Sequence, residues 1–174
     1  AIHNANGRIE VIGEDRANIA VLARKHARAE SEQAAHQLVD CIRVDTSEVG
    51  GNLELDVEVP RKWNRHGSAD LELRVPRQLR VRAASANGKL CLTGLRCAVQ
   101  VRSSNGSVQV RDVEGDVEIN TSNAKVCCTG TKGRLVVRSS NGKIEIEQHR
   151  GGLDASTSNG LIQASLEQLA KEGV

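Results

Sequence analysis

Residues 99–116 read VQVRSSNGSVQVRDVEGD, and an 18-residue pattern of this kind repeats without insertion through residues 81–170. Asparagine recurs every 18 residues, and four of the five asparagines are followed by glycine. A constant period is typical of repeat proteins in which each unit stacks on its neighbour. We predict that this Asn-Gly column marks the corners of the fold; its members are Asn87, Asn105, Asn123, Asn141, Asn159, Gly88, Gly106, Gly142 and Gly160.

Apolar and polar residues alternate on both sides of each corner, as in Val99 and Val101 before it and Val108 and Val110 after it. This alternation predicts two short strands per unit, each with one buried face. Two architectures fit: a β-meander with hairpins at the Asn-Gly pairs, and a β-solenoid in which each unit is one coil. The constant period favours the solenoid, because each coil must pair in register with the next one about 4.8 Å away.

Stacked coils place equivalent residues above one another, so we expect the asparagine side chains to hydrogen-bond along their column. The composition fits a thin interior between two strand layers about 10 Å apart, because it offers only small and branched apolar residues. Trp63 is the single aromatic residue, and the chain has no Phe, Tyr or Met. A hydroxyl also recurs two positions before each asparagine, in Ser85, Ser103, Thr121, Ser139 and Thr157.

Length and charge exclude several classes of protein. The chain has 174 residues, so we expect a single domain. Its 24 basic and 22 acidic residues give a net charge of +2, and it almost lacks aromatic residues. Both features argue against nucleic acid as a partner. No run of about 18 apolar residues is present, so we expect no membrane-spanning segment.

The single domain, residues 1–174, is expected to have three parts. Residues 1–80 form an irregular N-terminal part with a helix at about residues 30–40, capped by Ser31, and His3–Val11 as a sixth Asn-Gly corner. Five regular coils fill residues 81–170. Residues 171–174 form a tail that looks truncated, with Leu166–Lys171 weakly helical or an unfinished coil. Further strands are predicted at Ile19–Val21, Ile42–Asp45, Leu53–Val59 and Ala69–Val75, with Pro60 and Pro76 ending two of them.

Four segments in this order resemble a known family. They are NANGRIEV (4–11), RKHARAESEQAAHQLVDCIRV (24–44), GGNLELDVEVP (50–60) and LELRVP (71–76), followed by the SNG repeats. Together they resemble the bacterial "putative adhesin" family of β-strand-repeat domains of unknown function. The resemblance covers the whole chain. It implies an all-β, solenoid-like fold, a place in the bacterial envelope and further coils beyond residue 174, but no ligand.

We expect no metal site and no cofactor. A calcium-binding β-roll would need several carboxylates per turn, whereas these turns carry Ser, Asn and Gly, with scattered Asp112, Asp116 and Asp154. The odd number of cysteines has no disulfide or zinc spacing. Alternation directs Cys128 inward and Cys127 outward, and Cys91 shares the column of Cys127 two coils away. The cysteines are Cys41, Cys91, Cys97, Cys127 and Cys128.

The sequence shows no catalytic constellation. Serines recur at equivalent corners, which marks a structural role rather than a unique nucleophile. The histidines share no column and are each expected at the surface; they are His3, His26, His36, His66 and His149. We therefore expect no enzymatic activity.

Basic residues recur at two positions of the repeat. They suggest a stripe that docks a polyanion, although a merely solvated face is the simpler interpretation. The residues of this stripe are Lys89, Lys125, Lys143, Arg102 and Arg138.

The function that fits is a non-enzymatic binding, adhesion or scaffold module of a bacterial cell envelope, periplasmic or at the surface. Its partner would be an anionic envelope polymer or a lipid surface. The alternatives are a scaffold that self-associates through open coil edges and, behind it, an enzyme acting on an envelope polymer. The chain begins at Ala1 and has no methionine, so we expect its natural start to be missing, and a cytoplasmic location stays open.

Overall fold

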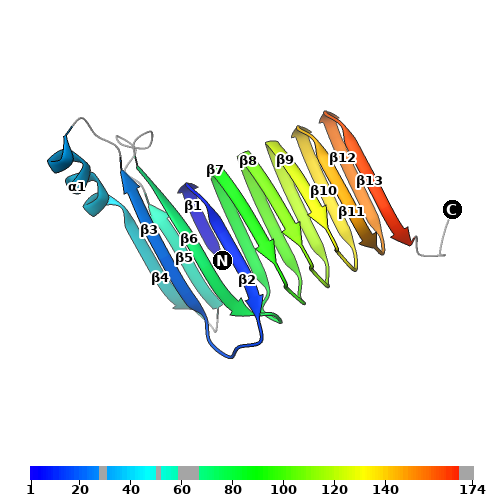
Figure 1. The fold of residues 1–174 in the computed structure, drawn as a ribbon, viewed down its shortest axis with the longest axis horizontal. Coiled ribbons are helices and arrows are strands. Elements are labelled where there is room, and N and C mark those ends of the chain that lie inside the picture. Colours follow the sequence, from blue (N-terminus) through cyan, green and yellow to red (C-terminus); the bar gives the residue numbers. More distant parts are fainter. Residues whose placement is uncertain (28–30, 50–51, 59–66, 169–174) are drawn as a thin grey trace.

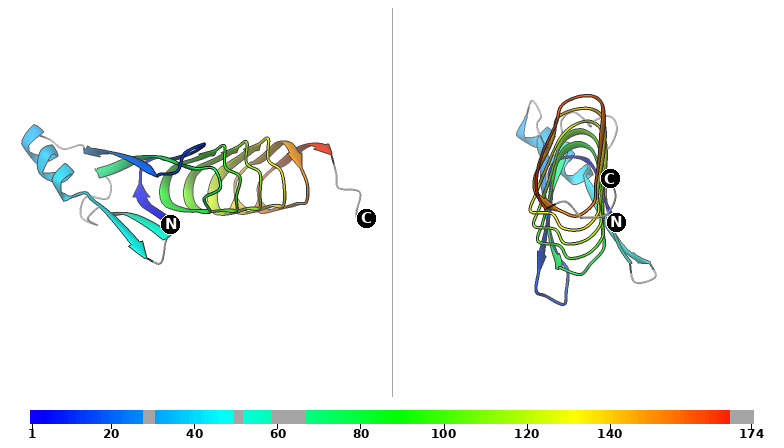
Figure 2. Two further views of the ribbon diagram at one scale, coloured as in Figure 1. Left: turned by 90° about the horizontal axis from the view of Figure 1, so that it is seen from below. Right: turned by 90° about the vertical axis from the view of Figure 1, so that its right-hand side faces the viewer.

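The computed structural model describes residues 1–27, 31–49, 52–58 and 67–168. These residues form an elongated β-solenoid whose coils stack along its long axis (Figure 1). Seen along that axis, the coils form a flattened ring with two strand layers (Figure 2). Strands of successive coils pair in parallel, as β7 (Val81–Thr93) does with β8 (Val99–Arg111). The solenoid is thus confirmed, and the meander is wrong.

Residues that pair between neighbouring strands of the regular coils are 18 positions apart in the sequence, which is the period of the repeat. Val81 pairs with Val99, and Val99 pairs with Val117 in β9 (Val117–Thr129). Strands β7, β8 and β9 each continue through the Asn-Gly corner, whereas the next coils divide there. The divided coils consist of β10 (Leu135–Asn141) with β11 (Ile144–Arg150), and β12 (Leu153–Asn159) with β13 (Ile162–Gln168).

The core is the space between the two strand layers. Val99, Val101, Val108 and Val110 all have no exposed surface, and their counterparts in neighbouring coils are buried in the same columns. Full burial of such a side chain stabilises the fold by about 1.5–3 kcal/mol relative to exposure. The alternation in the sequence therefore sets which face of each strand points inward.

The N-terminal part continues the solenoid in an unexpected order. Strands β1 (Ile2–Asn6) and β2 (Ile9–Glu14) form one coil, which stacks directly on β7. Its other side pairs with β5 (Asn52–Glu58) and β6 (Gly67–Pro76), which come later in the sequence. The expected sixth Asn-Gly corner is confirmed, but the description of residues 1–80 as irregular was too coarse.

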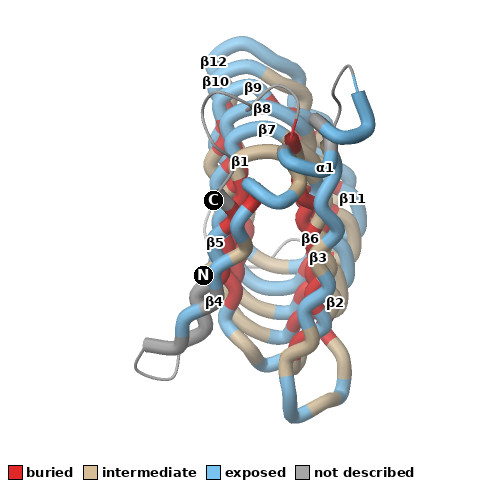
Figure 3. Tube along the Cα trace, turned by 90° about the vertical axis from the view of Figure 1, so that its left-hand side faces the viewer, coloured by how far each residue is buried: buried red, intermediate tan, exposed pale blue. Residues whose placement is uncertain are grey.

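Two strands that pair antiparallel with their neighbours, and the helix, lie at the N-terminal end of the stack (Figure 1). Strand β3 (Ala20–Ala27) pairs antiparallel with β6, and β4 (Arg43–Val49) pairs antiparallel with β5. Helix α1 (Glu32–Cys41) connects them, close to the predicted helix. Figure 3 views the stack from this end and shows buried residues along both walls of the interior.

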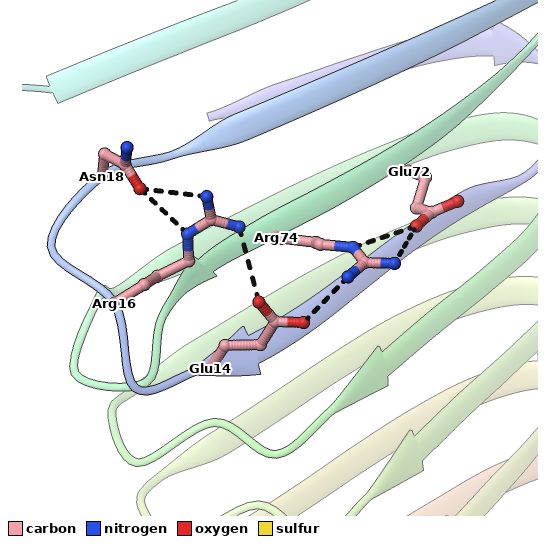
Figure 4. Close-up of polar contacts among 5 residues, drawn as sticks. All are labelled: Glu14, Arg16, Asn18, Glu72 and Arg74. Atoms are coloured by element: carbon pink, nitrogen blue, oxygen red, sulfur yellow. Dashed lines mark hydrogen bonds and ion pairs between the residues drawn. The ribbon is translucent and has the colours of Figure 1, made fainter.

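A network of charged and amide side chains lies where the chain passes from β2 to β3 beside β6 (Figure 4). Arg74 and Arg16 each donate to the Glu14 carboxylate at 3.4 Å. Arg74 also donates to Glu72 at 3.1 and 3.2 Å, and Arg16 donates to Asn18 at 2.9 and 3.1 Å. Surface ion pairs of this kind contribute little stability, and the network joins the chain reversal after β2 to two side chains of β6.

Several boundaries differ from the prediction. Strand β3 continues to Ala27, well beyond the predicted Val21, because it pairs with β6 along its whole length. Leu166–Gln168 lies in β13, which stacks on β11, so the coil alternative holds for these residues and the helix does not. Pro60, His66 and residues 169–174 lie outside the described part of the chain, and Pro76 is the last residue of β6.

Candidate binding surfaces

The Asn-Gly column forms one continuous hydrogen-bonded ladder. The side-chain amide Nδ2 of Asn105 donates to Oδ1 of Asn87 at 3.1 Å, and Asn123 donates to Asn105 at 3.0 Å. Asn141 and Asn159 continue the ladder at 2.8 and 3.0 Å. The first coil joins it through Asn6, which accepts from Asn87 at 3.0 Å. The predicted amide ladder is thus confirmed and has one more member than the regular repeat supplied.

The glycines of the column allow the backbones of neighbouring corners to approach closely. Gly88 and Gly106 have φ values of +148° and +133°, which favour residues without a side chain. A Cβ on Gly106 would lie 1.9 Å from the carbonyl oxygen of Gly88. The buried Ala124 takes this position in its coil and has no positive φ. The asparagine side chains and the close glycine contacts together make this corner rigid.

Removal of one ladder member should weaken the fold. Asn105→Ala deletes the hydrogen bonds to both Asn87 and Asn123, so we expect a loss of about 1–2 kcal/mol in the free energy of unfolding. Urea unfolding measures it. Ser104→Ala, at the adjacent exposed position, is the matched control and should change stability by less than about 0.5 kcal/mol. Equal effects of the two substitutions would contradict a stabilising ladder.

The lysines of the predicted basic stripe lie at the start of the second strand layer, directly after the Asn-Gly corner. Two of them share one carboxylate: Lys125 Nζ lies 2.8 Å and Lys143 Nζ lies 2.6 Å from the oxygens of Glu145. These hydrogen bonds, from Lys125 first, hold the pKa of the Glu145 carboxyl below its usual value. The same contact raises the pKa of Lys125. The lysine column is therefore partly neutralised within the protein.

This carboxylate predicts a pH effect. Because the pKa of Glu145 is lower in the folded state, its contribution to stability is present above the ordinary value of 4.5 and disappears as pH falls through the folded value. We expect Glu145→Gln to be slightly less stable than the unsubstituted chain at pH 7, with the gap closing below pH 4.5. Unfolding curves between pH 3 and 7 measure it. Glu147→Gln, on the same strand and without an ion pair in the described residues, should show no such gap; a gap independent of pH would contradict the assignment.

The arginines of the predicted stripe belong to the first strand layer, before the corner. Arg102 and Arg138 flank Asn120 in register, as the sequence predicted. Both are exposed, and Arg138 lies 3.9 Å from Asp154. The lysine and arginine columns thus lie on different strand layers and do not form one continuous stripe.

Sequence reasoning missed a groove beside these arginines. The groove has a volume of about 470 Å³ and crosses the outer face of the first strand layer. Four exposed arginines line it together with Asp116 and Glu118. In the described part of the chain, Arg80, Arg82 and Arg134 have no ion-pair partner. The signal was available, because Arg80 and Arg134 occupy the same position of the repeat three coils apart.

The cysteines are free thiols, and their directions match the alternation in part. Cys128 is buried, and burial raises its pKa to about 12, so the thiol stays protonated. Cys127 is half-buried. Cys91, which alternation directs outward, is nevertheless only 8% exposed, and its sulfur lies 3.7 Å from Oε1 of Gln109 in the next coil.

The prediction of a surface position for every histidine is wrong at His149, which is 1% exposed. Its Nδ1 lies 2.9 Å from the Thr131 hydroxyl, and its Nε2 lies 3.2 Å from the Gly152 carbonyl oxygen. Gln148 has φ +53°, and this bulge turns the next residue inward. His3, His26 and His36 are exposed as expected.

Two features are absent from the described residues. Within residues 1–27, 31–49, 52–58 and 67–168, no three His, Cys, Asp or Glu side chains gather as ligands for a metal ion. In those same ranges no helix combines the length and apolar character needed to cross a bilayer.

The fold and its outward columns define a β-solenoid repeat domain. The chain belongs to the Toastrack family (DUF4097), which matches residues 1–173. A search of curated proteins found no match. A crystal structure of a "putative cell adhesion protein" from Clostridium sporogenes is similar, with a TM-score of 0.53 over 95% of this chain and 91% of the other. At 8% identity this likeness concerns the fold.

Proposed function

We propose that this chain is a non-enzymatic binding and adhesion module of a bacterial cell envelope, periplasmic or at the surface. The supporting observation is the outward display of side chains in fixed columns, held by a buried core and the asparagine ladder. A rigid array of this kind can contact an extended partner at many points without a reactive centre. The adhesion role named for the Clostridium sporogenes structure is consistent with this function.

The proposed partner is an anionic envelope polymer or lipid surface. Basic side chains on both strand layers support it, among them the exposed Lys125, Arg102 and Arg138 and the half-buried Lys89 and Lys143 of the predicted stripe. Charge complementarity attracts an anionic partner, and salt screens such attraction over about 10 Å at 0.1 M ionic strength. Binding should therefore weaken as salt is added.

One experiment tests both the binding and the absence of catalysis. The purified chain is incubated with a bacterial envelope fraction and sedimented. We expect the chain in the pellet and no newly released polymer fragments in the supernatant. A chain that stays in the supernatant would contradict the binding function, and released fragments would contradict the non-enzymatic one.

Self-association is the second candidate, favoured by one observation. Among the described strands, β3 pairs with β6 alone, and it exposes Val21 and Leu22, whose relative exposures are 39% and 47%. A strand edge with apolar residues is a template for pairing with another chain. Sedimentation at rising concentration tests it: larger species that Leu22→Lys abolishes would support self-association, and a monomer throughout would exclude it.

A further inference from the structure

We infer that the arginine groove on the first strand layer binds a linear polymer carrying spaced oxyanion groups, phosphodiester or carboxylate. This inference rests on the proposed binding function and names the site and ligand class within it. We call the site the arginine groove and define it by Arg80, Arg82, Arg134 and Arg138, with Asp116 and Glu118 between them.

The arginines form two pairs at opposite ends of the groove. Arg80 and Arg82 border the coil of β7, and Arg134 and Arg138 border the coil of β10. Backbone hydrogen bonds link the column step by step, from Val81 to Ala98, from Val99 to Asp116 and from Val117 to Arg134. Three coil steps therefore separate the two pairs, a distance of about 14 Å at about 4.8 Å per step.

Three of the guanidinium groups are free to bind a ligand. Arg80, Arg82 and Arg134 are exposed and have no ion pair to a described carboxylate, and Arg138 has only the long 3.9 Å contact to Asp154. A guanidinium donates two parallel hydrogen bonds to a phosphate or carboxylate group. The strands beneath fix the Cα positions and therefore the spacing of the arginines, although each exposed side chain still loses rotamer freedom on binding.

The two carboxylates at the centre of the groove accept hydrogen bonds from uncharged groups of the protein. The Glu118 carboxylate accepts hydrogen bonds from Asn120 at 2.9 Å and from Gln100 at 3.1 Å. These bonds hold its pKa below the usual value, with smaller contributions from Arg138 and Arg102. Asp116 accepts from the backbone N–H of Arg134 at 3.4 Å. The groove thus has positive ends and a negative centre.

This charge pattern selects the ligand class. A continuous anionic surface such as a lipid bilayer would place negative charge against Asp116 and Glu118 as well as against the arginines. A polymer with anionic groups about 14 Å apart, or with uncharged or cationic groups between them, avoids that repulsion. We therefore favour a spaced polymer over a membrane.

The test uses three probes with the folded chain: a lipid-free sugar-phosphate polymer whose phosphodiesters are separated by uncharged sugars, hyaluronan, whose carboxylates alternate with uncharged sugars, and vesicles containing phosphatidylglycerol. Binding of at least one of the two polymers is expected. Arg80→Gln/Arg82→Gln and Arg134→Gln/Arg138→Gln should each weaken that binding about tenfold, as expected for the loss of hydrogen bonds between charged groups. The matched control Arg24→Gln/Lys25→Gln removes the same charge from exposed positions on β3, outside the groove, and should change binding less than about twofold.

Each outcome decides the inference. The preferred polymer distinguishes a phosphodiester from a carboxylate ligand. Binding to vesicles alone, no binding to either polymer, or equal losses in the groove variants and in the β3 control would overturn the arginine groove. If the polymers fail but the chain still sediments with envelope material, only this inference fails. If neither binds, the proposed function fails with it. Circular dichroism confirms that the variants, all at exposed or half-buried positions, remain folded.

Discussion

Gly106→Ala is expected to destabilise the chain by about 3–5 kcal/mol, the largest effect we expect of a single substitution. The new Cβ would lie 1.9 Å from the Gly88 carbonyl oxygen, and both atoms belong to paired strands that cannot separate without breaking the ladder. The φ of +133° adds strain for any residue with a side chain. Since small domains unfold with about 5–15 kcal/mol, this loss would lower the melting temperature sharply.

Gly152→Ala is the matched control for this prediction. A Cβ at Gly152 has no neighbouring atom within 4 Å, and its φ is not in the positive range. We expect a neutral or slightly stabilising effect, because alanine reduces the freedom of the unfolded chain. Thermal unfolding of the two variants compares them directly, and a Gly106→Ala chain as stable as Gly152→Ala would show that the corners do not touch as described.

Ile119→Ala is expected to cost about 2–5 kcal/mol, because it leaves a cavity in the thin core. The side chain has no exposed surface and lies between Val101 and Val137 of the adjacent coils. Because the core is only two strand layers thick, no further layer of side chains can move into the cavity. Urea unfolding measures the loss.

Val136→Ala provides the comparison for the core. Val136 is half-buried and faces outward on the neighbouring strand, so its truncation should cost less than about 1 kcal/mol. Similar losses at Ile119 and Val136 would mean that the strands do not have one buried and one outward face.

The regular coils could be predicted from the sequence because the repeat period and the alternation of apolar residues both indicate the same structure there. Asn87, Asn105 and Asn123 are spaced 18 residues apart, and residues that pair between neighbouring strands have the same spacing. The alternating valines of the sequence are the residues that point into the core. A solenoid imposes this agreement, since each coil contacts its neighbours alone. Arg102 and Arg138 likewise lie in register on either side of Asn120.

The order of coils at the N-terminal end could not be predicted. Asn6 and Gly7 have the sequence pattern of a corner. No pattern in the sequence around them, however, predicts that β1 and β2 lie between β7 and the later strands β5 and β6. That order depends on strand pairing across tens of residues and on the antiparallel β3 and β4, which no repeat marks.

The candidate site was predicted only in part, because pairing between coils decides which charges are free. Glu145 neutralises Lys125 from the next coil, a contact invisible in one unit of sequence. His149 was misjudged for a related reason: its column is buried throughout, as Leu95, Val113 and Thr131 show. That column lies just after a bulged position, so the alternation of the strand does not continue through it.

The most direct test of the central claim is to delete one coil. Removal of residues 99–116 joins two equivalent positions and keeps the alternation, so Asn123 can stack on Asn87. We predict a cooperative thermal transition and a β-sheet circular dichroism spectrum for this 18-residue deletion. Removal of residues 101–117, one residue fewer, joins Gln100 to Glu118 within the strand, so Val99 and Ile119 can no longer both face inward, and it should lower the melting temperature sharply or abolish the transition. Two deletions that fold equally well, or fail equally, would contradict a solenoid built from in-register 18-residue coils.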